Sequence, residues 1–215
     1  MHKLDSFDRV LVSLSGGIDS AALLYMVAKQ YTITHRTTEI YAITGYGKPD
    51  TLEAAKFVWG YVKNKFGRLN WKTHFDYDNY YDKSYYSHRG KADHEHRSIF
   101  MEEHNIKDVL HGRVKTTLTE EQLKQCETQY PQAVSKLLLN SHVIETKKTY
   151  MPQNRWEYTI HRPISNYTKS MVVDYIKEHN ANELLTKTIS CYKQKKEACK
   201  QCPSCLEKMD LLGHY

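Results

Sequence analysis

A short stretch near the N-terminus combines the residue types that bind phosphate. The apolar run 10–14 contains two valines and predicts a buried strand, and the Ala- and Leu-rich run 21–28 predicts a helix. Between them, residues 15–20 read Ser-Gly-Gly-Ile-Asp-Ser, which favours a sharp turn that a ligand can approach closely. The free amides of the first helical turn and the hydroxyls of Ser15 and Ser20 then form an anion site, and phosphate is the usual anion there.

Asp19 adds a second element to this site. A carboxylate in the first turn of a helix is stabilised by the helix dipole. Beside a polyphosphate the same carboxylate is repelled unless a divalent cation lies between them. The stretch therefore predicts phosphate together with Mg²⁺. The simpler alternative is a helix start with Ser and Asp caps and a glycine turn.

The string resembles the signature of the PP-loop ATP pyrophosphatases, which split ATP between its α- and β-phosphates and pass AMP to a substrate oxygen. It lacks the Gly-Lys-Ser/Thr ending of the Walker loop. The resemblance implies ATP as the cosubstrate. It also implies these ATP-binding residues: Leu14, Ser15, Gly16, Gly17, Asp19 and Ser20.

A second cluster of reactive side chains lies near the C-terminus. Cys191, Cys199, Cys202 and Cys205 are spaced C-x7-C-x2-C-x2-C, and four thiolates in a reducing compartment fit tetrahedral Zn²⁺. Because no coordination position stays open, such a site is structural. Two alternatives remain: a pair of disulfides, which needs an oxidising compartment, and a [4Fe–4S] cluster, which also uses four thiolates. The lysines around the cysteines either solubilise the segment or touch phosphate.

The elements that must position these residues alternate between strand and helix. We expect strands at 10–14, 40–44, 71–75, 109–112 and 158–160, and helices at 21–28, 51–66, 94–105 and 120–139, the last interrupted by Pro131. Residues 31–38 read as a loop, and residues 76–93 as a loop over the site. Thr168 is predicted to cap a further helix whose inward residues are Met171, Val172, Tyr175 and Ile176.

This alternation predicts an α/β fold, with a parallel sheet covered by helices on both faces. Ligands of such sheets bind beyond the carboxyl ends of the strands, where residues 15–20 lie. We expect a nucleotide-binding domain over residues 1–165 and a helix with the metal-binding segment over residues 166–215.

The composition is that of a protein with one sizeable core. The chain has 215 residues, of which 40% are hydrophobic, and 31 basic against 25 acidic residues give a net charge of +6. This charge suits phosphate-bearing ligands, and it permits nucleic acid as a partner without requiring it. We expect no membrane partner and a cytoplasmic location with reduced cysteines, because no apolar run is long enough to span a bilayer and the N-terminus has no signal-peptide core.

Together, the two ends of the chain resemble the 7-cyano-7-deazaguanine synthases of the queuosine pathway. In that family a Cys-Tyr pair, here Cys191-Tyr192 after Ser190, opens the zinc motif, and C-x-x-C-x-x-C closes it. Weaker similarities are Tyr46-Gly47, Arg97-Ser98-Ile99-Phe100, Gly112 and Lys169. His94-Glu95-His96 and Ser98 depart from the family pattern, which marks a divergent member with changes near the base pocket.

The resemblance implies an ATP-dependent carbon–nitrogen ligase. The substrate carboxylate of 7-carboxy-7-deazaguanine is adenylated, ammonia displaces AMP, and a second activation of the amide gives the nitrile. Asp19, Arg97 and Lys169 are then catalytic candidates, Gly112 joins the ATP-binding residues, Zn²⁺ and Mg²⁺ are cofactors, and the protein is a homodimer. The alternative for Arg97 and Lys169 is surface salt bridging.

Three further readings of the sequence remain. His94, His96 and His111 are candidate acid–base groups, or solvated and structurally bonded histidines. Another PP-loop enzyme, a tRNA thiolase or a lysidine-type synthase, would share the nucleotide loop, and thiolases often carry an Fe–S cluster. A zinc-containing nucleic-acid-binding module with a degenerate nucleotide site is the alternative that is not an enzyme.

Overall fold

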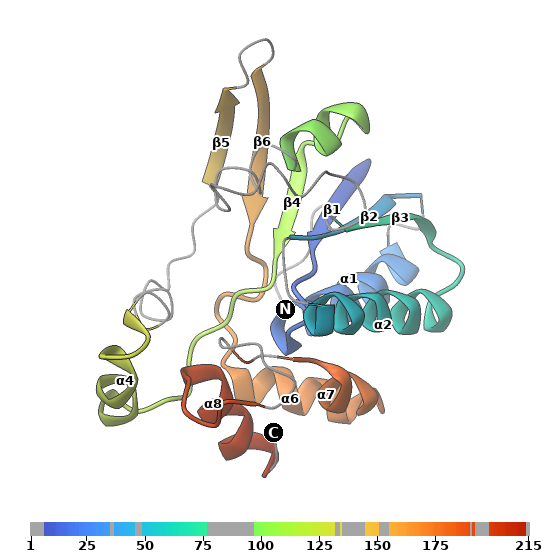
Figure 1. Cartoon of the computed structure of the whole chain (residues 1–215). Helices are drawn as coiled ribbons and strands as arrows, with labels where there is room; N and C mark the ends of the chain where they lie inside the picture. The colour runs from blue at the N-terminus through green and yellow to red at the C-terminus, as the bar shows by residue number, and fades with distance from the viewer. Residues whose placement is uncertain are drawn as a thin grey trace.

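The computed structural model describes residues 7–34, 37–45, 49–76, 97–131, 134, 145–150, 155–189, 191 and 198–213. In this part of the chain one six-stranded sheet has the order β3-β2-β1-β4-β6-β5 (Figure 1). The strands are β1 (Arg9–Ser13), β2 (Glu39–Thr44), β3 (Asn70–Asp76), β4 (Asp108–His111), β5 (Glu145–Tyr150) and β6 (Arg155–His161).

Five of the strands are parallel, as the sequence predicted. β1 lies in the middle of the parallel set and pairs with β2 on one side and β4 on the other. Ser13 at the end of β1 is level with Ile43 of β2 and with His111 of β4. The carboxyl ends of three strands therefore meet at one edge, and the loop after β1 begins at that edge. β5 pairs antiparallel with β6 and forms a hairpin that the sequence analysis did not predict.

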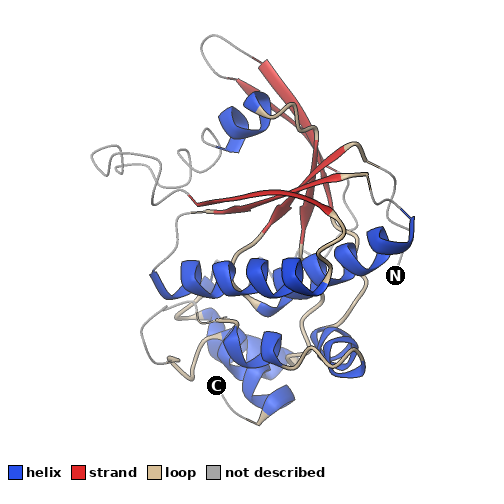
Figure 2. Cartoon of the chain, turned by 90° about the vertical axis from the view of Figure 1, so that its right-hand side faces the viewer, coloured by secondary structure: helices blue, strands red, loops and turns tan. Residues whose placement is uncertain are grey.

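Helices cover both faces of the sheet, which confirms the predicted fold class. The named helices are α1 (Ile18–Thr34), α2 (Pro49–Lys65), α4 (Glu120–Glu127), α6 (Lys169–Glu178), α7 (Glu183–Lys187) and α8 (Pro203–Leu212). A further helix covers residues 97–103. Figure 2 shows the long helices in a layer along one face of the strands and a short helix on the opposite side.

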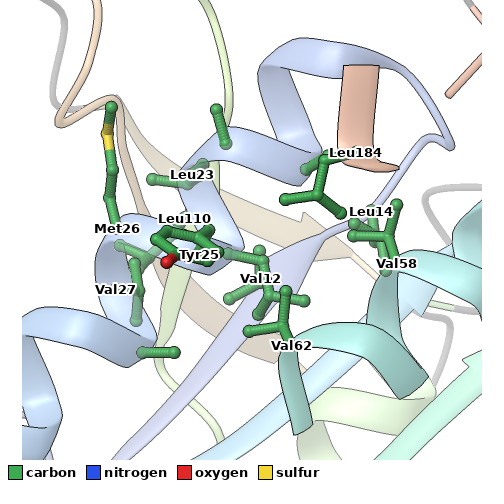
Figure 3. Packing of buried hydrophobic residues seen from close by; sticks show 14 of the residues in the cluster. Val12, Leu14, Leu23, Tyr25, Met26, Val27, Val58, Val62, Leu110 and Leu184 are labelled. Atoms are coloured by element: carbon green, nitrogen blue, oxygen red, sulfur yellow. The ribbon is translucent and has the colours of Figure 1, made fainter. Parts of the chain in front are cut away.

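Alternation along β1 divides the core into two parts. Val10, Val12 and Leu14 belong to one core cluster with residues of α1 and α2. Figure 3 shows Val12 and Leu14 in this cluster. Leu11 faces the other way, toward Phe100 and Met101 of helix 97–103. All of these side chains are buried, so both faces of the central strand are removed from water. The burial fixes the register of β1 and hence the position of the loop that follows it.

One sequence-based helix boundary was wrong, and a second helix is described only in part. Residues 31–38 were predicted as a loop, but α1 continues to Thr34 because Tyr31 is fully buried in the core. Burial of an aromatic side chain therefore extended α1 beyond the point where the sequence pattern ended it. The helix predicted over 120–139, with an interruption at Pro131, begins as α4, which ends at Glu127; residues 128–129 form a turn, and Pro131 and Val134 are helical again. Positions 132–133 and 135–139 lie outside the described residues.

The helix that begins after Thr168 was predicted correctly except for one inward residue. Thr168 is the N-cap of α6, and its hydroxyl accepts a hydrogen bond from the backbone N–H of Met171. The Met171 side chain is 47% exposed, so its predicted inward position is wrong. Val172, Val173 and Ile176 form the buried face instead, in the same core cluster as β1 and α1. Among the described residues, no helix is long and apolar enough to cross a membrane.

Candidate nucleotide and metal sites

One hydroxyl group shapes the loop between β1 and α1. Ser20 Oγ accepts a hydrogen bond from the backbone N–H of Ser15 at 3.1 Å and donates one to the Gly17 carbonyl at 3.0 Å. Ser15 Oγ lies 3.1 Å from the same hydroxyl. The Ala21 N–H also donates to the Gly17 carbonyl, as the first i-to-i−4 bond of α1. The amides before Ala21 have no acceptor within the helix, so the loop can offer them to an anion.

Leu14 determines where this loop begins. Its side chain is fully buried. Its N–H donates to the carbonyl of Ile43 at 2.8 Å, and its carbonyl accepts from Thr44 Oγ1 at 2.7 Å. Both backbone groups of Leu14 are therefore bonded to the end of β2. The structure gives Leu14 a positioning role at the start of the loop.

Two glycines allow the backbone around the loop to pack closely. Gly16 has a φ of +75°, and a Cβ there would lie 2.4 Å from the carbonyl oxygen of Thr51 at the start of α2. A Cβ on Gly112, just after β4, would lie 2.6 Å from the carbonyl oxygen of Asp19 and 2.8 Å from Ser20 Cα. Both distances are far below normal contact, so only glycine fits. Gly112 therefore lies directly beside the first turn of α1, and its part in ATP binding stays a prediction.

The side chains of Asp19 and Lys169 meet over the same turn. Lys169 Nζ lies 2.8 Å from each carboxylate oxygen of Asp19, although the two residues are 150 positions apart. The lysine side chain is only 10% exposed. Lys169 is the first residue of α6, and its backbone N–H donates to the carbonyl of Lys115 at 3.3 Å. Two of the predicted catalytic residues are thus in direct contact in this structure.

Glu207 is a third charged residue at this place, and the sequence analysis did not identify it. It lies on α8, its side chain is 1% exposed, and its Oε2 is 3.7 Å from Lys169 Nζ. Oε1 accepts hydrogen bonds from Thr116 Oγ1 at 2.6 Å and from the N–H of Thr117 at 3.0 Å. A Glu two residues after the last cysteine was the only sequence signal, and periodicity alone would not place it beside Lys169.

Arg97 lies at the same edge of the sheet, one strand away from the loop. Its Nη1 is 3.4 Å from Nε2 of His111, the last residue of β4. The guanidinium Nε is buried and makes no hydrogen bond among the described residues. Because His111 is level with Ser13 of β1, this pair stands beside the nucleotide loop. The arginine can therefore offer donors to an anionic group at the carboxyl edge.

The four predicted metal ligands converge. The Sγ atoms of Cys191, Cys199, Cys202 and Cys205 all lie within 4.8 Å of one another. Three of these cysteines are buried, and Cys199 is half-buried. Cys202 is the N-cap of α8, and Cys205 lies in its first turn. The convergence shows that these four thiols could hold a metal ion together, and the fifth cysteine, Cys126, is not part of the group.

Hydrogen bonds prepare one of these thiols for deprotonation. Burial raises the pKa of Cys199, but the backbone N–H groups of Gln201 and Cys202 and the hydroxyl of Tyr130 outweigh it and lower the pKa to about 6. Burial, followed by the neighbouring Cys202, raises the pKa of Cys205. Close thiols cannot all ionise without a cation among them, which is the electrostatic situation that a metal ion relieves.

The metal-binding segment also touches the nucleotide loop. Ile189, two residues before Cys191, donates its N–H to the carbonyl of Gly16 at 2.9 Å. Lys208 Nζ on α8 lies 3.3 Å from the carbonyl of Thr188. The desolvated position of Lys208 lowers its pKa. An open hollow of about 550 Å³ lies beside Ile189, the residue that contacts Gly16. It is lined by Asp50, Glu53, Ala54, Phe57, Lys187 and Ile189.

Several predicted features lie outside the described residues. These are Tyr46, Gly47, the loop 77–93, His94, His96, Ser190 and Tyr192. The two-domain division at residue 165 stays a prediction.

The parallel sheet, the glycine-containing loop at its carboxyl edge and the cysteine segment define a PP-loop α/β protein. A family model described as "Queuosine biosynthesis protein QueC" matches residues 83–214, which is more than half of the chain, so the protein belongs to this family. The match includes Arg97, Gly112, Lys169 and the four cysteines, and it begins after the nucleotide loop. It confirms the predicted resemblance and supports an ATP-using PP-loop enzyme of nucleoside modification.

Two other comparisons complete this picture. No curated protein sequence matches the chain significantly. Among solved structures, the chain is similar to the U34-tRNA thiolase NcsA from Methanococcus maripaludis with its [4Fe-4S] cluster. The identity is 15%, the alignment covers 99% of this chain and 67% of that chain, and the TM-score is 0.49.

Proposed function

We propose that the protein converts 7-carboxy-7-deazaguanine to 7-cyano-7-deazaguanine, with ATP as the activating cosubstrate and ammonia as the nitrogen source. The observation that carries this proposal is the QueC family match over residues 83–214 in a chain whose remaining part forms a phosphate-type loop. The family match supports the deazapurine substrate, and the loop supports the use of a nucleotide.

The first half of the reaction forms a leaving group. A substrate carboxylate oxygen attacks the α-phosphorus of ATP, the bond to the bridging oxygen breaks, and pyrophosphate leaves with its electron pair. In this proposal the amides before Ala21 and the hydroxyl of Ser15 receive the pyrophosphate, supported by their position in the loop between β1 and α1. We assign Arg97 to the substrate carboxylate, which is supported by the position of its guanidinium beside the end of β4 at the carboxyl edge of the sheet.

The second half adds nitrogen. Ammonia attacks the acyl adenylate, AMP departs with the C–O bond electrons, and a proton is lost to give the amide. A second ATP activates the amide oxygen in the same way; loss of AMP and of the remaining N–H protons leaves the nitrile. Two ATP molecules are therefore converted to two AMP and two pyrophosphate for each nitrile. In each activation Lys169 is within reach of the loop as a cationic contact for phosphate.

Asp19 is the residue that would hold Mg²⁺ beside the phosphates. The donor type fits a hard cation, because Asp19 offers carboxylate oxygens in the first turn of α1, beside the amides that would face phosphate. When bound there, Mg²⁺ would offset phosphate charge.

We also propose that the four cysteines hold one structural Zn²⁺. Ligands of tetrahedral zinc at ~2.3 Å lie roughly 3.8 Å apart, and the four sulfurs here lie within 4.8 Å of one another. A four-iron cluster needs a wider set, because each thiolate binds a separate iron. Metal analysis is expected to give one zinc per chain and a colourless protein. A brown protein with iron would contradict zinc and favour the thiolase alternative.

The reaction is tested by incubation of the metal-loaded protein with ATP, Mg²⁺, ammonium and 7-carboxy-7-deazaguanine. We expect AMP, pyrophosphate and the cyano product, with two AMP for each nitrile. Without ammonium, the reaction should stop at the enzyme-bound adenylate, so AMP should not accumulate in solution. If AMP forms with other acceptors but never with the deazaguanine, the substrate proposal fails while the nucleotide loop stands.

The candidate role of Arg97 has its own test. We expect Arg97→Lys to raise KM for the carboxylate substrate on the order of tenfold, because a bidentate contact becomes a point charge. KM for ATP should change little. An equal loss for both substrates would place Arg97 in a structural role.

A further inference from the structure

Glu207 is a buried carboxylate that the proposed reaction does not use. Its side chain is 1% exposed, and one of its oxygens is fixed by Thr116 Oγ1 and the N–H of Thr117. These two bonds hold the carboxylate in place without any help from Lys169. The other oxygen, Oε2, is buried, accepts no hydrogen bond among the described residues, and lies 3.7 Å from Lys169 Nζ.

The group contains more carboxylates than ammonium groups. Asp19 and Glu207 contribute two negative charges, and Lys169 contributes one positive charge. In this structure the ammonium lies 2.8 Å from both oxygens of Asp19 and at a longer distance from Glu207. A buried carboxylate oxygen without a hydrogen bond is costly, so Oε2 of Glu207, 3.7 Å from the ammonium, offers Lys169 a second hydrogen-bond acceptor.

The competing demand on Asp19 gives this second acceptor a purpose. Asp19 lies in the first turn of α1, where the triphosphate and its accompanying cation are expected. When the Asp19 carboxylate turns to that cation, Lys169 loses its closest partner. A mobile lysine on an exposed surface would then leave the site, but the Lys169 side chain is almost buried and Glu207 stands next to it.

We propose that Glu207 is a positioning residue: it keeps the Lys169 ammonium beside the nucleotide loop when Asp19 turns to the cation that accompanies ATP. Glu207 acts through Lys169 and does not touch the nucleotide. The inference rests on the proposed use of ATP, but it is independent of which acceptor the enzyme adenylates.

The position of Glu207 also gives the cysteine segment a part in nucleotide binding. Glu207 lies on α8, whose N-cap is Cys202 and whose first turn contains Cys205. A metal bound by these cysteines therefore fixes the helix that presents the carboxylate. The contact between α8 and α6 closes this connection from the metal segment to Lys169.

The test is binding of the Mg²⁺ complex of a non-hydrolysable ATP analogue, measured by calorimetry on the metal-loaded chain. Glu207→Gln keeps an oxygen that can accept from Thr116 and Thr117 but removes the charge. We expect the analogue to bind about tenfold more weakly to this variant, because a hydrogen bond to a charged group is lost. If Glu207 were only a nearby negative charge, its removal would strengthen binding of the anionic nucleotide, which is the opposite sign.

The double variant with Lys169→Gln shows whether the effect passes through the lysine. If it does, Glu207→Gln should not weaken binding further in the Lys169→Gln background. Asp210→Asn is the matched control: Asp210 is an exposed carboxylate on the same helix that accepts from Gln122, and its loss should leave analogue binding within twofold of the unaltered chain.

The outcomes separate clearly. Unchanged or tighter binding by the Glu207→Gln variant, or a full additive loss in the Lys169→Gln background, would overturn the proposal. If Glu207→Gln fails to fold, as judged by circular dichroism, Glu207→Asp replaces it, with weaker analogue binding as the expected result. If the unaltered chain binds the analogue but never forms the cyano product, only the assigned acceptor fails. If the unaltered chain binds no analogue, the inference about Glu207 fails together with the proposal that the loop binds ATP.

Discussion

Gly112 gives the sharpest test of how the nucleotide loop is built. In Gly112→Ala the added Cβ would lie 2.6 Å from the carbonyl oxygen of Asp19, 2.8 Å from its carbonyl carbon and 2.8 Å from Ser20 Cα. All three atoms belong to the backbone of the first turn of α1, so no side-chain rotation can relieve the contact. Normal carbon contacts begin near ~3.5 Å, so the end of β4 and the start of α1 must separate by roughly 0.5–1 Å.

The energetic consequence follows from this displacement. Overpacking of this kind costs about 1–3 kcal/mol, and for a chain of this size each kcal/mol lowers Tm by about 2–4 °C. The expected fall in Tm is therefore about 2–12 °C. Because the displaced turn carries the phosphate-facing amides, a shift near 1 Å can also lower kcat/KM for ATP on the order of 100-fold.

The assay pairs thermal melting with ATP kinetics, and Gly60→Ala is its control. Gly60 lies within α2, and a Cβ there meets nothing within 4 Å. The control should gain stability, by up to about 1 kcal/mol, because alanine is the better helix former. The reasoning about close packing is refuted if Gly112→Ala melts at the same temperature as the unaltered chain and keeps its kcat/KM for ATP.

Three further changes are expected to have measurable effects. Removal of the metal with a strong chelator should expose α8 to limited proteolysis and lower the apparent Tm, because zinc binding at four thiolates is worth on the order of 10 kcal/mol. Added zinc should restore the protease resistance and the Tm. Unchanged proteolysis would exclude a structural metal. Thr168→Ala should cost about 1 kcal/mol in urea unfolding, because the cap of α6 is lost, and a loss below a few tenths would show that the cap is dispensable. The hydrogen bond from Lys72, opposed by burial, lowers the pKa of Glu39 below its ordinary value of 4.5. The ionised Glu39 carboxylate therefore contributes fully to the stability of the folded protein above pH 4.5, and this contribution is lost as the pH falls through the lowered pKa. Glu39→Gln should therefore flatten the fall in stability below pH 4.5, and an unchanged acid limb in urea titrations at several pH values would contradict this.

Local sequence signals were sufficient for the two motifs and for most of the fold. Residues 15–20 contain their own turn, caps and helix start, so the loop forms where the pattern predicted it. The four cysteines converge because a C-x2-C-x2-C run and the first turn of α8 bring three of them together with little help from the rest of the chain. Strands β1, β2 and β4 were predictable because buried parallel strands are short apolar runs.

The failures share a physical cause. Tyr31 looked like a loop residue and is buried in the core, and Met171 looked like a core residue and is exposed. Tyrosine has both an apolar ring and a polar hydroxyl, and methionine is flexible, so each can lie in the core or on the surface. The neighbouring helices and strands determine which of these two environments the side chain occupies. The hairpin of β5 with β6 was missed because its first strand, Glu-Thr-Lys-Lys-Thr-Tyr, has little apolar periodicity and is stabilised by pairing with β6.

The sequence by itself determined the kinds of chemistry available: amides and hydroxyls for phosphate, a carboxylate for a hard cation, and four thiolates for a metal. These depend on residues close together along the chain, where backbone geometry alone fixes their relation. The tertiary structure decided which distant groups act as one site. Lys169 meets Asp19 across 150 residues, and Glu207 reaches Lys169 from α8, the helix whose N-cap is Cys202. Such contacts depend on how the buried faces of separate helices pack against one sheet, and no local pattern encodes that packing.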